Sequence, residues 1–233
     1  MNDQACVHER IGAVRARIAR AAARVGRSPD AVRLVAVSKT WPAESVRGAA
    51  AAGQIDFGEN RVQEALQKIE ATAGLPLRWH LVGHLQSNKA RRAAAAFHLI
   101  HSIDRPELLR ALDGAAADAG ASPGILLQVD LAGEATKHGA ALDSLEALVE
   151  AALECRAARL QGLMLLPPFL EDPEDARPYF RRLRELRDEL AGRGVHPAAL
   201  GELSMGMSHD FEVAIEEGAT IVRIGTAIFG TRG

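Results

Sequence analysis

Lys39 is the residue whose position most strongly suggests covalent chemistry. It follows the short apolar run 34–37, which is typical of a buried strand. A lysine at the end of such a strand lies at the mouth or the rim of a barrel, where desolvation favours the neutral amine and makes it a nucleophile toward an aldehyde. The alternative is a rim lysine that pairs with a carboxylate. We therefore take Lys39 as a candidate for forming a Schiff base.

Small and hydroxyl-bearing residues follow the last two apolar runs of the chain. Ser204, Gly206 and Ser208 lie at the end of one run, and Gly225 and Thr226 lie at the end of the next. Hydroxyls, glycines that allow close backbone approach, and the start of a helix near Ser208 are the components of a phosphate site. The alternative is structural, with Ser208 as a helix cap and Gly225 as a turn glycine.

Two further residues are candidates for ligand contacts. Arg223 lies within the last predicted strand, where an arginine inside a barrel needs a partner, either a buried carboxylate or a ring nitrogen or acid group of a ligand. An arginine beside a pyridine nitrogen keeps that nitrogen unprotonated, which weakens the ring as an electron sink. Asn60 follows the second predicted strand and is either a ligand contact or a helix cap.

The histidines do not predict a metal site. Four of them are close in sequence, but no matching carboxylate spacing follows, so we expect no metal; they are His80, His84, His98 and His101. Lys137 and His138 lie in a predicted loop after the fifth strand and are expected to be solvated.

Short strand-like runs alternate with longer helical patterns along the whole chain. The predicted strands are 34–37, 55–57, 78–82, 98–103, 125–130, 162–166, 202–205 and 220–224. Helices are predicted at 4–25, from Pro42, from a capping box at Asn60 to about 71, at 87–96, from a capping box at Asp104, at 142–158, from Asp172 to about 191 with a bend at Pro178, and at 208–217.

Strict alternation predicts a parallel sheet, and eight units close into a (β/α)8 barrel. We expect one domain over residues 1–233, with the first helix covering the gap left after the last strand. An open, doubly wound sheet is the competing architecture, although no glycine-rich dinucleotide motif follows the first strand.

Composition sets limits on partners and compartment. The net charge is −2 with 25% charged residues, which excludes a strong electrostatic drive toward nucleic acid or an anionic membrane. The two cysteines, Cys6 and Cys155, are far apart in helical patterns, which favours a reducing compartment without disulfides. The first 20 residues lack an apolar run of signal length, and no stretch is long enough to span a membrane. We expect a soluble, cytoplasmic protein.

Several segments together resemble one family, the pyridoxal phosphate homeostasis proteins, also called the YggS/PROSC family. The segments that carry the resemblance span most of the chain: LVAVSKT (34–40), FGENRVQE (57–64), WHLVGHLQSNK (79–89), GLM (162–164), LSMGMSHD (203–210) and VRIGTAIFG (222–230). The pair LSMGMS and RIGTAIFG is highly specific. Departures from the family pattern are Trp41, where many relatives have lysine, Arg61, where many have an aromatic residue, and the loop 133–140.

The resemblance implies a fold, a cofactor and a set of contacts. The fold would be the barrel of alanine racemase standing alone, and the cofactor would be pyridoxal 5'-phosphate (PLP), held as a Schiff base on Lys39. Arg223 would face the pyridine nitrogen, and Asn60 would lie near the ring. The phosphate would be surrounded by Ser204, Gly206, Ser208, Gly225 and Thr226.

The resemblance also implies a carrier or buffer of PLP that delivers it to PLP-dependent apoenzymes, with no catalytic residue of its own. Racemisation needs an acid–base group on each face of the substrate carbon. Alanine racemase-like enzymes take the second group from another domain, for which this chain is too short, and Tyr179 is not placed to replace it. The alternatives are a small racemase or lyase that uses Lys39 as its base, and a barrel that only docks on apoenzymes. A monomer is expected.

Overall fold

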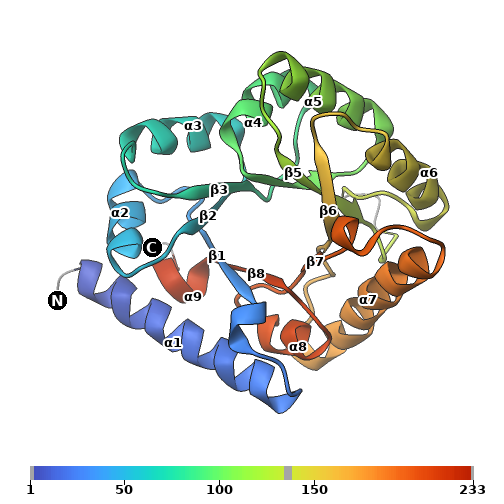
Figure 1. Ribbon diagram of the computed structural model, residues 1–233. Coiled ribbons are helices and arrows are strands. Elements are labelled where there is room, and N and C mark those ends of the chain that lie inside the picture. The colour runs from blue at the N-terminus through green and yellow to red at the C-terminus, as the bar shows by residue number, and fades with distance from the viewer. Residues whose placement is uncertain (1–2, 134–137, 232–233) are drawn as a thin grey trace.

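Eight parallel strands close into a barrel in which each strand pairs with the next and β8 returns to β1 (Figure 1). The computed structural model describes residues 3–133 and 138–231. The (β/α)8 prediction is confirmed, and the open sheet is excluded. The strands are β1 (Arg33–Val37), β2 (Asp56–Glu59), β3 (Arg78–Leu81), β4 (Leu99–Ile103), β5 (Gly124–Val129), β6 (Arg159–Leu165), β7 (Glu202–Ser204) and β8 (Ile221–Ile224).

Helices surround the barrel and cover the outer face of the sheet (Figure 1). Among them, α1 packs against α2, α8 and α9, so the first helix closes the ring beside β8, as expected from the sequence. The α-helices are α1 (Asp3–Arg24), α2 (Ala43–Ala51), α3 (Val62–Ala71), α4 (Ala90–Ala96), α5 (Pro106–Asp118), α6 (Leu142–Leu153), α7 (Arg177–Gly192), α8 (Phe211–Glu216) and α9 (Thr226–Phe229). Short 3₁₀ helices are η1 (Pro29–Ala31), η2 (Ser87–Lys89), η3 (Pro173–Ala176) and η4 (Pro197–Ala199).

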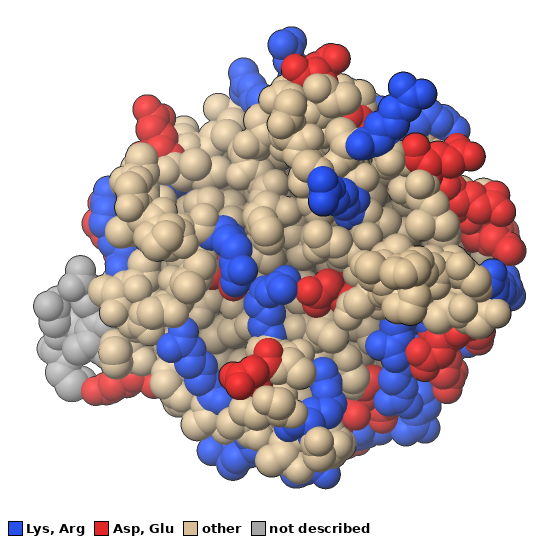
Figure 2. Space-filling model, in the orientation of Figure 1, with Lys and Arg blue, Asp and Glu red and all other residues tan. Residues whose placement is uncertain are grey.

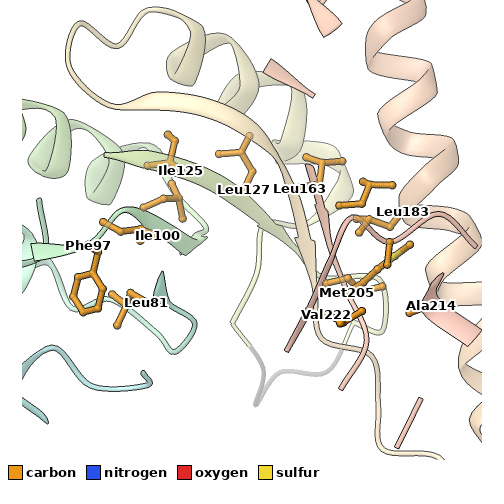
Figure 3. Packing of buried hydrophobic residues seen from close by; sticks show 14 of the residues in the cluster. Leu81, Phe97, Ile100, Ile125, Leu127, Leu163, Leu183, Met205, Ala214 and Val222 are labelled. Atoms are coloured by element: carbon orange, nitrogen blue, oxygen red, sulfur yellow. The ribbon is translucent and has the colours of Figure 1, made fainter. Parts of the chain in front are cut away.

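The apolar residues form two layers, because side chains of a strand alternate between the two faces of the sheet. Outward-facing residues such as Ile100 and Leu163 pack against the helices and form the large core seen in Figure 3. Inward-facing residues form a smaller cluster that fills the barrel: Val35, Leu99, Leu126, Met164 and Ile221. The barrel is therefore a packed core, and ligands must approach its rim.

Several local predictions are wrong. The helix predicted from Ser208 begins at Phe211, so Ser208 lies in the preceding turn. Pro178 lies in the first turn of α7, where a proline fits without bending the helix. Neither predicted capping box forms: α3 and α5 begin without a side-chain cap, and Asp104 instead bonds Arg105.

Two expectations drawn from composition can be compared with the structure. Within residues 3–133 and 138–231, no helix combines the length and the apolar character needed to cross a membrane. Cys6 and Cys155 are both free thiols, as their sequence context predicted.

Candidate functional site

The carboxyl end of β1 brings Lys39 next to the end of β8. Lys39 is exposed at the rim of the barrel and is not buried inside it. A side chain added at Gly225 would lie 3.3 Å from the carbonyl oxygen of Val37, which shows how closely the two strand ends approach. A group held by Lys39 is therefore near the backbone that follows β8.

A buried lysine holds the backbone on the amino side of Lys39. The Lys68 Nζ donates to the Ser38 carbonyl oxygen at 2.7 Å, to Glu59 Oε1 at 2.7 Å and to Glu64 Oε1 at 2.8 Å. The Ser38 hydroxyl donates to the same Glu59 oxygen at 2.6 Å. We call Ser38, Glu59, Glu64 and Lys68 the clamp. Burial raises the pKa of Glu59, against the opposing effect of Lys68 and Ser38.

The clamp also holds the residue that follows Lys39. Thr40 has a φ of 67°, which is rare for a residue with a side chain. Its backbone N–H donates to Glu64 Oε1. Burial tends to raise the pKa of Glu64, but the bonds from Lys68 and Thr40 outweigh it and lower the pKa. Both flanks of Lys39 are therefore fixed by side chains from β2 and α3.

Three of the five predicted phosphate residues are joined or adjacent at the ends of β7 and β8. The Ser208 Oγ accepts from the backbone N–H groups of Gly225 and Ala227, each at 3.3 Å. Thr226 lies between these two donors and is exposed. Gly206 has a φ of 91°, which lets the chain turn after β7. The turn packs over Phe211, because a Cβ added at Gly206 would lie 2.9 Å from the Phe211 Cα.

Ser204 lies deeper than the other predicted phosphate residues. It is fully buried, and its Oγ lies 2.7 Å from Arg223 Nη1 and 2.8 Å from His101 Nδ1. Arg223 also donates to the Leu165 carbonyl oxygen at 2.9 Å. Burial lowers the pKa of Arg223 to about 10. In the described part of the chain Arg223 forms no ion pair, so the buried salt bridge considered for it is not found.

Asn60 lies in a cleft of about 440 Å³ at the same end of the barrel. Its lining comes from loops that follow five different strands and includes Asn60, His84, His138, Phe169 and Met207. Gly83 allows the backbone after β3 to pass close to Asn60, because a side chain there would come within 2.4 Å of the Asn60 carbonyl oxygen. Met207, which lines the cleft, directly precedes Ser208 in the chain.

The histidines divide into two groups. His84 and His138 stack at 3.7 Å between ring centroids, and together with Asp104 they place one potential ligand atom each within 4.8 Å of one another. His138 is exposed, as expected, whereas Lys137 lies outside the described residues. His80 and His101 are instead buried inside the barrel and bonded to each other at 3.0 Å.

Sequence reasoning missed the clamp and the buried histidines. His80 and His101 occupy inward positions of β3 and β4, so period-two alternation in a barrel could have placed them inside. Lys68 carries no comparable signal, because its position in α3 is that of an ordinary helical lysine. Its burial depends on where β2 and the loop after β1 meet.

Comparison with known proteins places this arrangement in a family. The model of the alanine racemase N-terminal domain matches residues 10–233. The pyridoxal phosphate homeostasis protein of Aquifex aeolicus is 49% identical over 224 residues, which cover 96% of this chain and 97% of the relative. The protein of the same name from Pseudomonas aeruginosa is 48% identical over 227 residues, which cover 97% and 96% of the two chains.

A solved structure agrees with these relatives. PipY of Synechococcus elongatus PCC7942, solved with PLP bound, is 40% identical, with a TM-score of 0.84, covering 96% of this chain and 100% of that one. The matched fold is a barrel of the alanine racemase type. The chain belongs to the pyridoxal phosphate homeostasis protein family, and the resemblance stated from its motifs is confirmed.

Proposed function

We propose that this protein binds PLP as a Schiff base on Lys39 and acts in PLP homeostasis as a carrier. One observation supports this most directly: exposed Lys39 and the Ser208 hydroxyl, which the backbone N–H groups of Gly225 and Ala227 hold in place, lie at neighbouring strand ends. An aldehyde that also carries a phosphate needs both of these features. PLP would supply a reactive aldehyde and a ring that can accept electrons.

The residues present fit such a group. The Ser208 hydroxyl accepts from two backbone N–H groups and keeps its own proton to donate to a phosphate oxygen. Gly206, Gly225 and Thr226 complete this phosphate region in the proposal. Arg223 has donors beyond the two it uses for Ser204 and Leu165, and we assign them to the pyridine nitrogen. Asn60 is assigned to the ring through the cleft that it lines.

Ser204 has a different place in this proposal. Its hydroxyl lies against Arg223 and His101 inside the barrel. We therefore assign it to holding Arg223 and not to the phosphate.

A carrier agrees with the chemistry of the site better than an enzyme does. An arginine donor keeps the pyridine nitrogen unprotonated, so the ring withdraws electrons weakly from a bound substrate. Tyr179 lies on α7, which packs against β6, η3 and α8 on the outside of the barrel. The curated relatives are named as homeostasis proteins.

Partners and location are further parts of the proposal. We infer that residues 1–233 act as one domain, as a monomer in the cytoplasm, and deliver PLP to apoenzymes. Acidic and basic side chains are interspersed on the face shown in Figure 2, without a broad patch of one sign. Such a face gives little attraction for nucleic acid or anionic membranes.

The central test compares three proteins after incubation with PLP: the wild type, Lys39→Ala and Lys39→Arg. The arginine variant keeps the positive charge but cannot form a Schiff base. We expect a visible absorbance band in the wild type alone, and borohydride reduction should leave an adduct that peptide mass mapping assigns to Lys39. A wild type without the band, or an adduct on another lysine, would refute the proposal.

The enzyme alternative is tested in deuterated water. A carrier incorporates no deuterium at the α-carbon of added amino acids beyond the rate of free PLP. Sustained incorporation that disappears in Lys39→Arg would identify a racemase or lyase. Transfer of PLP to an apoenzyme, measured by recovery of that enzyme's activity, supports the delivery role if it is faster than transfer from free PLP.

A further inference from the structure

A continuous chain of hydrogen bonds runs through the inside of the barrel from Arg223 to Asp56. Arg223 Nη1 lies 2.7 Å from Ser204 Oγ, and Ser204 Oγ lies 2.8 Å from His101 Nδ1. His101 Nε2 lies 3.0 Å from His80 Nδ1, and His80 Nε2 lies 2.9 Å from Asp56 Oδ1. We call Ser204, His101, His80 and Asp56 the relay. Its residues come from β7, β4, β3 and β2.

The chemistry at the Asp56 end fixes the direction of every bond. Arg78 donates to the other oxygen of Asp56 at 2.7 Å, and the pKa of Asp56 is lowered: burial would raise it, but the bonds from His80 and Arg78 outweigh burial. The ionised carboxylate can only accept, so His80 Nε2 must carry a proton. Burial lowers the pKa of His80, so its ring is neutral and its Nδ1 is an acceptor.

The remaining bonds lead from His80 to the mouth of the barrel. His101 Nε2 must donate to His80 Nδ1. His101 is fully buried, and this burial lowers its pKa well below the usual value, so its ring is neutral. Its Nδ1 therefore accepts the Ser204 proton. Ser204 then has only lone pairs left for Arg223, and a guanidinium can only donate. All four bonds can therefore form at the same time, with one donor and one acceptor in each. In every bond the donor lies on the side of Arg223 and the acceptor on the side of Asp56.

We propose that this relay is a positioning device that holds Arg223 as a permanent donor toward an aromatic nitrogen at the mouth. This rests on the proposed function, in which that nitrogen belongs to PLP. Within the described residues no carboxylate pairs with Arg223, so the oriented Ser204 oxygen and the Leu165 carbonyl oxygen hold the guanidinium in place. The negative charge of Asp56 acts on Arg223 through polarised neutral groups.

The first experiment reads the relay in the protein without PLP. Long-range proton–nitrogen NMR spectra distinguish the two neutral tautomers of histidine, and the spectra of His80 and His101 are assigned with single variants. We expect both rings to be neutral and protonated at Nε2. An Nδ1–H tautomer or a charged ring at neutral pH would overturn the proposal, whether or not PLP binds.

The second experiment uses PLP itself with a matched pair of variants. His101→Gln can accept from Ser204 through its amide oxygen and donate to His80 through its amide nitrogen, whereas His101→Leu can do neither. We expect His101→Leu to shift the absorbance band and to weaken PLP binding about tenfold, as for the loss of an oriented hydrogen bond to a charged group. His101→Gln should remain within about threefold of the wild type on the same scale.

Controls separate this effect from misfolding and from failure of the proposed function. His8→Gln, an exposed residue of α1, should behave as the wild type. If His101→Leu does not fold, Ser204→Ala removes the same link and should show the same shift and weakening. Variants that match the wild type in band and affinity would overturn the relay alone. Failure of the wild type to take up PLP would overturn the proposed function. It would also overturn the role of the relay in holding Arg223 toward the ring nitrogen of PLP.

Discussion

Two buried polar networks serve the two ends of the same candidate site by different means. The clamp beside β1 is ionic, with the Lys68 amine bonded to two carboxylates and to the Ser38 carbonyl oxygen. The relay inside the barrel passes through neutral groups, and its charges, Arg223 and Asp56, lie only at its ends. One network fixes the backbone around Lys39, and the other orients a side chain.

The difference follows from where each network lies. Lys68 packs near the rim, where Glu64 is partly exposed and water still screens charge. His101 and His80 lie in the packed interior, where an unpaired charge costs several kcal/mol and neutral rings with fixed tautomers are preferred. The exposed Lys39 thus has a rigid ionic support, while the interior transmits orientation without holding a net charge.

Removing the centre of the clamp should have the largest effect. Lys68→Met keeps the length of the side chain but leaves Glu59 buried without its cation, and Glu59 Oε2 already lacks a hydrogen-bond partner within the described residues. We expect the free energy of unfolding to fall by about 3–5 kcal/mol, measured by urea denaturation. The same change frees the Ser38 carbonyl, so Schiff-base formation on Lys39 should also slow.

A second substitution tests whether the loss of stability in Lys68→Met arises from the uncompensated charge of Glu59. Glu59→Gln in the Lys68→Met background removes that charge, and it should recover a large part of the lost stability. Arg91→Ala, at an exposed position of α4, is the control and should change stability by less than about 0.5 kcal/mol. A double variant no more stable than Lys68→Met would show that the charge is not the cause.

Acid should affect the relay histidines and Glu59 of the clamp in opposite directions. The relay histidines have lowered folded pKa values because of burial, so below pH 6.5 the unfolded chain binds more protons and stability falls as the pH falls. Glu59 has a raised folded pKa because of burial, so the folded state binds more protons above the unfolded value of 4.5, and this group adds stability as the pH falls.

Urea denaturation between pH 7.5 and 5 measures both contributions. Each relay histidine contributes a slope of up to about 1.4 kcal/mol per pH unit below its unfolded pKa. We expect stability to fall with acid in the wild type, to fall less steeply in His101→Leu and to fall more steeply in Glu59→Gln. His8→Gln should keep the slope of the wild type. A His101→Leu slope equal to that of the wild type would mean that this histidine is not held neutral.

The two networks also show what the sequence can predict. Alternation of strands and helices predicted all eight strands and the closed barrel, because that pattern depends on local periodicity. The placement of Lys39 at the same edge of the barrel as Ser208, Gly225 and Thr226 was predictable, because parallel strands place their carboxyl ends at one edge. The joining of β8 to β1 then brings those ends together.

The partners of buried polar groups were not predictable in the same way. Ser204 was expected at the phosphate, but its inward position in the short strand β7 directs its hydroxyl toward His101 on β4, 103 residues earlier in the chain. Such a pairing depends on the stagger of strands across the barrel, which local patterns do not encode. The missing caps at Asn60 and Asp104 have a different origin, since the N-cap positions of α3 and α5 are Arg61 and Arg105, one residue later than the capping boxes require.

The smallest expected effect concerns the backbone that the clamp holds. Thr40→Gly relieves the cost of a φ of 67°, roughly 1 kcal/mol for a residue with a side chain, but it also makes the unfolded chain more flexible by a similar amount. We therefore expect a change in unfolding free energy of less than about 1 kcal/mol. The glycine keeps the N–H that donates to Glu64, so Schiff-base formation should be preserved.

Thr40→Pro lacks that N–H and cannot adopt this φ, and it should lose both stability and the absorbance band. If Thr40→Gly lost the band while keeping its stability, the Thr40 side chain itself, and not the clamped backbone, would be what positions Lys39.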